Sequence, residues 1–230
     1  MFLLGHSCWS YLFTKLTGRQ LKVQVPAYLA LLAGILPDFD IYFRPLIQHH
    51  TYTHSLLVII PTVVILTIFF GRFGLAFSAG IVSHLVTDSL VGSIPPLYPL
   101  YPNMDVGLSL GIPSIADTIL EMGAFGLVIL YAYKNGDYKL ILKPQRDSLL
   151  LAIPLMAIVT LTLLFAGDNN IPLATLAFAR RSLTAITVGH ILLCGILGLG
   201  ALQGLRWYKT ARMTGEQSHS DPKPPSLQAP

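Results

Sequence analysis

The sequence places acidic and histidine side chains within or beside apolar stretches, where each one needs a partner or a task. Five of the seven histidines and five of the eleven acidic residues occupy such positions. They are His6, Asp38, Asp40, His49, His50, His54, His84, Asp88, Asp117 and Glu121. Imidazole and carboxylate groups together bind zinc, manganese or iron. The residue types therefore predict a divalent metal centre, most simply zinc, with room for about two or three ions.

Two pairs of these ionisable residues are spaced so that both members would lie on the same face of a helix. His84 and Asp88, and likewise Asp117 and Glu121, are four residues apart and would share one face of a helix. Two neighbouring acids in a low dielectric repel each other unless a cation or protons compensate them. The expected metal ligands are His6, Asp38, Asp40, His49, His54, His84, Asp88, Asp117 and Glu121.

Simpler interpretations exist for some of these residues. His190, isolated in the last apolar stretch, is more typical of a hydrogen-bonded packing residue. Asp38 and Asp40 could cap a helix, and His49 and His50 could be solvated at the membrane surface. The gathering of ten such groups toward one side of the membrane favours the metal centre.

The composition indicates that the ionisable residues are held by membrane-embedded segments. The chain of 230 residues is 53% hydrophobic and only 11% charged, and its mean hydropathy is +0.63. Soluble chains carry roughly 25% charged residues, so we expect an integral membrane protein. Cys8 and Cys194 each lie in an apolar run, which excludes a disulfide scaffold. The net charge of +4 is concentrated in short loops, which suits anionic lipids better than nucleic acid, and no nucleic-acid partner is expected.

The apolar stretches predict an all-α, polytopic membrane protein with about seven membrane segments. Four clear segments are expected at 73–92, 114–133, 148–166 and 183–203, a shorter one at 55–70, and two short ones at 2–14 and 25–37. Residues 1–212 would form one membrane-embedded domain that holds the metal centre. Residues 213–230, which are rich in proline and lack an apolar run, are expected to be a disordered tail.

Loop charge predicts the orientation in the cell's inner membrane. Short basic loops tend to remain cytoplasmic, and Lys134, Lys139, Lys143 and Arg146 crowd one such loop. Alternation from that loop places the C-terminus in the cytoplasm and the N-terminus outside. The predicted metal ligands then face outward.

Four sequence blocks resemble a known family. In order, they are Gly5-His6-Ser7, Leu36-Pro37-Asp38-Phe39-Asp40, His49-x-x-x-Thr53-His54-Ser55-Leu56-Leu57, and Gly80-x-x-Ser83-His84-Leu85-x-x-Asp88 followed by Leu97-Tyr98-Pro99. Together, over residues 1–101, they resemble the YdjM-like family, described as inner-membrane metal-dependent hydrolases. Some members are labelled LexA-binding, a label that we do not extend to this chain. The family usually has His-Arg-Gly ahead of the Thr-His-Ser block, whereas this chain has His49-His50-Thr51, so either histidine could be the ligand.

A looser similarity is to the zinc-dependent phospholipase C and P1 nuclease group. The order of His6, Asp38 or Asp40, His54 and two helical pairs is similar to the order of metal ligands in that group. The similarity implies that a metal-activated water cleaves a phosphoester, with Asp38 or Asp40 as the catalytic base. For a site at head-group depth, the expected substrate is a membrane lipid or a lipid-linked phosphoester.

Two other functions fit the same residues. In a cation- or proton-coupled transporter, acids and histidines would line a pathway spread across the membrane. A scaffold that retains a structural metal would keep the ligands without turnover. The expected one-sided position of the ionisable groups favours the hydrolase, and the oligomeric state is left open.

Overall fold

The computed structural model describes residues 1–112, 114–168 and 181–214. Its elements are α1 (Leu3–Gln20), α2 (Ala27–Ala33), η1 (Pro37–Phe43), η2 (Tyr52–His54), α3 (Leu56–Val91), α4 (Ile115–Asn135), α5 (Lys139–Leu142), η3 (Arg146–Leu151), α6 (Ala152–Asp168) and α8 (Arg181–Thr214). The described chain contains no β-strand beyond an isolated bridge between Ile94 and Val106. The all-α prediction is therefore confirmed.

The expectation of about seven membrane segments is not supported. Among the described residues, four helices are long and apolar enough to cross a membrane, namely Leu56–Val91, Ile115–Asn135, Arg146–Phe165 and Ser182–Met213. The predicted segment 25–37 contains only the seven-residue α2, which at about 1.5 Å per residue is far shorter than a bilayer. The segment 2–14 falls in α1, whose polar residues Ser7, Ser10 and Thr14 are buried against protein.

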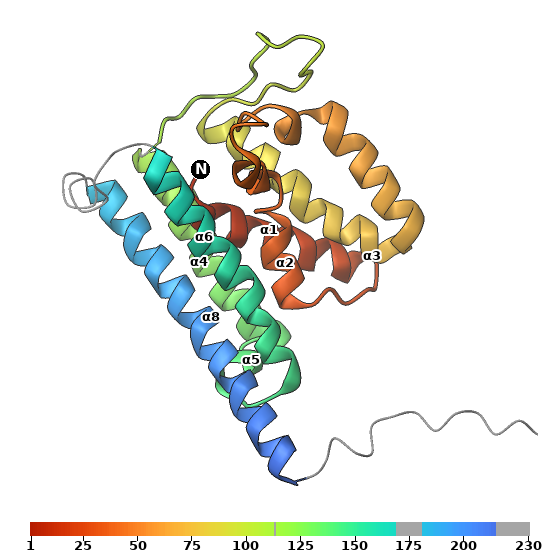
Figure 1. The fold of residues 1–230 in the computed structure, drawn as a ribbon, viewed down its shortest axis with the longest axis vertical. Coiled ribbons are helices and arrows are strands. Elements are labelled where there is room, and N and C mark those ends of the chain that lie inside the picture. Colours follow the sequence, from red (N-terminus) through yellow and green to blue (C-terminus); the bar gives the residue numbers. More distant parts are fainter. Residues whose placement is uncertain (113, 169–180, 215–230) are drawn as a thin grey trace, which may run out of the picture.

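The predicted segments 55–70 and 73–92 are two arms of the single element α3. The backbone leaves helical geometry at Gly71, where φ is +55° and ψ is −133°. Glycine adopts this conformation without the steric cost that a Cβ would add. Figure 1 shows the chain turning back there, so that the two arms of α3 form a V.

Helix α1 lies at the centre of the molecule. Figure 1 shows α4, α6 and α8 running side by side along one flank, with the V of α3 on the other flank and α1 and α2 between them. Helix α1 packs mainly against α3, α4 and α2. The main apolar core joins α1 and α2 to α4, α6 and α8. The first helix is therefore an internal support for the elements around it.

Local capping sets where two of the long helices begin. Ser55 accepts a hydrogen bond from the backbone N–H of Leu57 at the start of α3, and Ser114 accepts one from that of Asp117 at the start of α4. Gly136, with φ of +87°, ends α4 in the left-handed conformation typical of a helix C-terminus. The cap at Ser114 therefore sets where the first turn of α4, which carries Asp117, begins.

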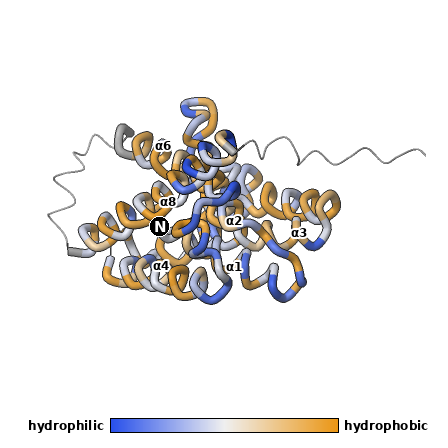
Figure 2. Tube along the Cα trace, turned by 90° about the horizontal axis from the view of Figure 1, so that it is seen from below, coloured by the Kyte–Doolittle hydropathy of each residue, from blue (hydrophilic) through white to orange (hydrophobic). Residues whose placement is uncertain are grey.

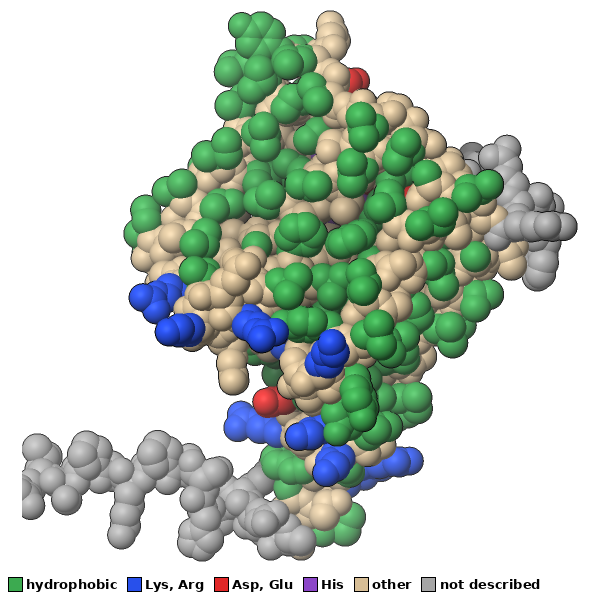
Figure 3. All heavy atoms as spheres, turned by 180° about the vertical axis from the view of Figure 1, so that it is seen from behind, with side chains coloured by type: hydrophobic (Ala, Val, Ile, Leu, Met, Phe, Trp, Pro, Cys, Tyr) green, Lys and Arg blue, Asp and Glu red, His purple; other side chains and the backbone are tan. Residues whose placement is uncertain are grey.

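The surface has the character of a membrane protein. Hydrophobic residues follow the helices in Figure 2, and Figure 3 shows them covering most of one face of the molecule. On α3, Ile68 and Phe69 are exposed by 73% and 76%. Lys and Arg side chains gather at the lower end in Figure 3. Of the expected disordered tail, Met213 and Thr214 are helical, and residues 215–230 lie outside the described residues.

The close approach of α1 and α2 generates a stability prediction. A Cβ on Gly34 would lie 2.3 Å from the carbonyl oxygen of His6 and 2.4 Å from Cβ of Ser10. We expect Gly34→Ala to destabilise the protein by about 1–3 kcal/mol, because backbone atoms must move apart. Thermal unfolding in detergent measures the effect. Gly123→Ala is the control, because no atom lies within 4 Å of its added Cβ, and equal stability of the two variants would contradict the prediction.

Candidate metal centre

Seven of the predicted residues come from five segments and meet beside the N-terminus, in the upper half of Figure 1. We define the metal centre by these residues. His6 lies on α1, Asp38 on η1, and His54 on η2, while His84 and Asp88 lie near the end of α3 and His49 and His50 lie in the loop between η1 and η2. All except His49 and His50 are buried. Long-range packing thus gathers groups that are up to 82 residues apart in the sequence.

Asp88 is the central carboxylate. Its Oδ2 lies 3.1 Å from Nε2 of His84 and 3.5 Å from Nε2 of His54. Its Oδ1 lies 3.2 Å from Nε2 of His6 and 3.3 Å from the α-amino group of Met1. One carboxylate therefore faces histidines through both of its oxygens, which is the arrangement of a bridging ligand.

Asp38 completes this arrangement from η1. Its Oδ1 lies 3.5 Å from Nε2 of His54 and 3.6 Å from Nε2 of His84. Burial raises the pKa of Asp38, but the imidazoles of His84, His54 and His6 outweigh burial and hold that pKa well below its ordinary value. The carboxylate is therefore ionised and available as a ligand.

The histidine rings are oriented by partners outside the metal centre. Nδ1 of His84 lies 2.6 Å from the carbonyl oxygen of Gly34, to which it donates, and this hydrogen bond turns Nε2 of the ring toward the centre. The Nε2 atoms of His84 and His54 face each other at 3.0 Å. On the opposite side, Oγ1 of Thr87 lies 3.2 Å from Nδ1 of His6. Hydrogen bonds at one ring nitrogen that free the other are typical of metal-binding histidines.

Within the part of the chain that the structure describes, three groups of side chains could hold a metal ion. In each group the potential ligand atoms lie within 4.8 Å of one another. The groups are His6, His84 and Asp88; Asp38, His54 and His84; and His49, His50 and His54. Oδ2 of Asp88 is buried without a hydrogen-bond donor, which a cation would compensate. The nitrogen and oxygen donors and their burial therefore fit a divalent transition metal.

Asp40 lies behind the metal centre and belongs to none of the three groups. Its Oδ1 is 2.8 Å from Nδ1 of His49, and its Oδ2 accepts a hydrogen bond of 2.7 Å from Oγ1 of Thr53. Nε2 of His49 is 3.9 Å from Oδ1 of Asp38, toward the centre. Asp40 therefore orients His49, in the way that a carboxylate orients a histidine in a catalytic pair.

The structure distinguishes the environments of His49 and His50, which the sequence left as alternatives. The side chain of His49 is 11% exposed and is held by Asp40, whereas that of His50 is 44% exposed. The ring of His50 stacks on that of His54 at 4.3 Å between centroids. His49 is thus an anchored side chain, and His50 lies at the solvent-facing mouth of the centre.

Asp117 and Glu121 are buried on the first turns of α4, but the structure places them in none of the three groups. The Glu121 carboxylate accepts hydrogen bonds from the backbone N–H groups of Phe2, at 2.7 Å, and Gly5, at 3.1 Å. Glu121 therefore caps the start of α1, where unpaired N–H groups favour an anion. Neither oxygen of Asp117 has a hydrogen-bond partner in the described chain.

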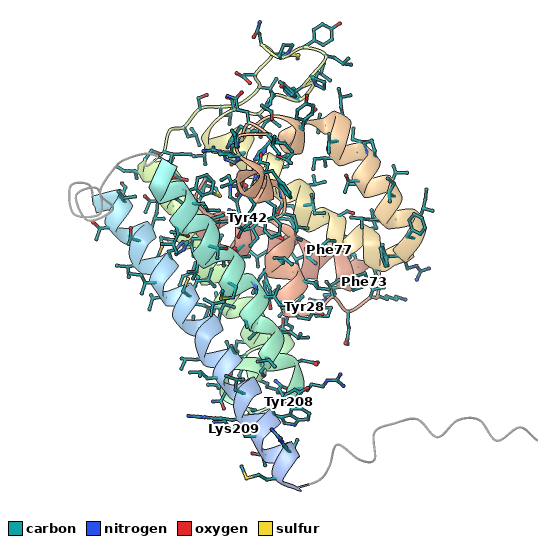
Figure 4. All side chains as sticks on the ribbon, viewed as in Figure 1. Tyr28, Tyr42, Phe73, Phe77, Tyr208 and Lys209 are labelled. Atoms are coloured by element: carbon teal, nitrogen blue, oxygen red, sulfur yellow. The ribbon has the colours of Figure 1, made fainter. Side chains whose placement is uncertain are left out.

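Sequence reasoning missed several residues that position the metal centre. The hydroxyl groups of Thr53 and Thr87 are hydrogen-bonded to ring nitrogens of His54 and His6. The contact of His84 is with the backbone carbonyl of Gly34, and a backbone contact cannot be predicted from residue type. Tyr42, labelled in Figure 4, is hydrogen-bonded to Thr160 and ties η1 to α6. His190 shares a hydrogen bond of 3.1 Å with Oγ1 of Thr162, in agreement with a packing role.

Comparison with known proteins gives one match. The family model described as YdjM inner membrane protein matches residues 1–171. That range includes all the predicted site residues. No curated protein and no solved structure matches the chain. The similarity to zinc-dependent phospholipase C and P1 nuclease is therefore not shown by these comparisons.

Removal of a central ligand should abolish metal binding. We expect His84→Ala and Asp88→Asn each to retain less than about a tenth of the metal of the wild-type protein, measured by elemental analysis after purification. His190→Ala is the matched control, since it removes an intramembrane histidine outside the three groups. Normal metal content in both the His84 and the Asp88 variant would contradict a metal centre at this position.

Proposed function

Because the chain belongs to the YdjM inner membrane protein family, we propose that this inner membrane protein is a metal-dependent hydrolase. The observation that carries the proposal is the position of Asp88, which meets His6 through one oxygen and His54 and His84 through the other. A bound divalent metal would activate water as a nucleophile and stabilise the charge that develops on the substrate. Zinc suits this set of nitrogen and oxygen donors, and manganese and iron are the other candidates.

The chain's own residues divide the remaining work. We propose that the metal is held by His6, Asp38, His54, His84 and Asp88. The two oxygens of Asp40 are hydrogen-bonded to His49 and Thr53. His49 would take a proton from water, and Asp40 would stabilise the protonated form of His49. This assigns the two aspartates different roles, one as a ligand and one in proton transfer.

The proposed substrate is a phosphoester of a membrane lipid or of a lipid-linked molecule. The metal centre lies where α3 ends and α4 begins, and both of these helices are candidate membrane spans. A site at the ends of apolar helices meets the head groups of lipids rather than their chains. The gathering of its ionisable groups at one end favours a hydrolase over a transporter, which needs such groups through the membrane depth.

Turnover should depend on both the metal and Asp40. We expect the metal-loaded protein to hydrolyse at least one member of a panel of phospholipids, and a chelator to abolish this activity. Asp40→Asn should lower the rate by about 100-fold or more while metal content remains normal, because His49 loses its orienting carboxylate. Asp147→Asn, which neutralises an exposed acid at the other end of the molecule, serves as control. If metal-loaded protein leaves the whole panel intact, the proposed activity is wrong.

The distribution of charge supports an outward-facing metal centre. Lys and Arg side chains gather at one end of the molecule in Figure 3, and the metal centre lies toward the opposite end. Basic residues are retained on the cytoplasmic side of inner membrane proteins. We therefore propose that the end of α8 faces the cytoplasm.

This orientation can be tested by labelling with a membrane-impermeant maleimide. A cysteine introduced by Asp105→Cys, at an exposed position between α3 and α4, should react from the outer side of the membrane. One introduced by Lys143→Cys should react only after the membrane is opened. The wild-type protein, in which Cys8 is buried, measures background labelling. The reverse pattern would show that the metal centre faces the cytoplasm.

A further inference from the structure

A second polar site lies at the basic end of the molecule, away from the metal centre. It is an open cavity of about 760 Å³ lined by the end of α1, the segment that leads into α2, and the turn between α4 and α5. We name it the basic cavity and define its charged lining by Lys15, Arg19, Lys22, Lys139, Asp137 and Asp147. None of these residues belongs to the metal centre, so the proposed hydrolase does not use the cavity.

The lining has an excess of positive charge that is not internally paired. Lys15 forms an ion pair of 2.7 Å with Asp137. Within the described chain, no salt bridge engages Arg19, Lys22 or Lys139. The unpaired cations come from three different segments and surround one hollow. Such an arrangement attracts an anion that can contact several of them at once.

A partly buried hydrogen-bond network keeps Asp137 from neutralising these cations. The hydroxyl of Tyr11 donates a hydrogen bond of 2.6 Å to Oδ2 of Asp137, and Nδ2 of Asn135 donates to the same Tyr11 oxygen at 3.2 Å. The ion pair with Lys15 uses that Asp137 oxygen as well. The acid is therefore held against the wall of the cavity, while Arg19 and Lys22 remain exposed.

The cavity lies at the level of the lipid head groups. Its lining includes Asn135, which ends one candidate span, and Gln145, which directly precedes another. Apolar side chains and two tyrosines complete the wall, one of them Tyr28 on α2, labelled in Figure 4. Tyrosine is enriched at membrane interfaces because its ring is apolar and its hydroxyl is polar. A ligand here can place an anionic group against the cations and an apolar part toward the membrane.

We propose that the basic cavity binds a phosphate group, the chemistry shared by an anionic phospholipid head group and free phosphate. Lysine and arginine bind phosphate through charge-assisted hydrogen bonds. Basic residues scattered along a cytoplasmic surface would attract anionic lipids without selecting a site. The basic cavity differs because its cations, from three segments, line one shared hollow.

The test compares ligands and variants of the full-length protein in a neutral detergent. Thermal unfolding is measured with added phosphatidylglycerol, phosphatidylcholine or inorganic phosphate. The cavity variant combines Arg19→Gln, Lys22→Gln and Lys139→Gln. The control variant combines Arg206→Gln, Lys209→Gln and Arg212→Gln, which removes three exposed cations of α8 at the same end of the molecule. Unfolding without ligand shows that both variants are folded.

Phosphatidylglycerol should stabilise the wild-type and control proteins more than phosphatidylcholine does. The cavity variant should need roughly tenfold or more phosphatidylglycerol for the same shift. Stabilisation by inorganic phosphate alone, again lost in the cavity variant, would support the site and identify free phosphate as the source. Equal losses in the cavity and control variants, or no stabilisation by either phosphatidylglycerol or phosphate, would overturn the proposal.

Discussion

The compensation of buried charge is the constraint on which the structure depends. Asp38, His84 and Asp88 are buried at the end of apolar helices, where an uncompensated carboxylate costs on the order of several kcal/mol. The arrangement offsets part of this cost by facing each carboxylate with imidazole nitrogens at 3.1–3.6 Å, while Oδ2 of Asp88 still has no hydrogen-bond donor in the described residues. The same geometry is what a divalent cation requires. The stability of the fold and the binding of a metal would therefore both require these carboxylates and imidazoles to lie close together.

The central position of α1 follows from this constraint. This helix presents His6 to Asp88, while Glu121 of α4 caps its first backbone N–H groups. Farther along, Ser10 donates to the carbonyl of Ala30 and so joins α1 to α2. At its other end Lys15 reaches Asp137 beyond α4. A helix with polar residues along its length can be placed in a membrane protein because its neighbours satisfy those groups.

The molecule thus has polar chemistry at two ends and an apolar surface between them. The candidate metal centre combines imidazoles with buried carboxylates, whereas the basic cavity presents unpaired cations from three segments. Both lie where candidate spans begin or end, at head-group depth. The proposed hydrolysis of lipid phosphoesters at one surface and the proposed binding of anionic lipids at the other would both be served by this arrangement. The two sites share no residue, so each can be altered without removing the other.

Composition and helical spacing are local properties of the sequence. They were therefore enough to predict a membrane protein, an all-α fold and the residue types of the candidate metal centre. The pairing of His84 with Asp88 follows directly from their separation of one helical turn. The different roles of the acidic residues depend on the tertiary structure. Asp88 contacts the histidines, Asp40 orients His49, and Glu121 caps α1. The tertiary structure also decided that α1 and α2 are internal and that α3 turns back at Gly71, which left four candidate spans where about seven were expected. Those outcomes depend on which surfaces meet across long sequence separations, and the spacing of residues along one helix does not encode that information.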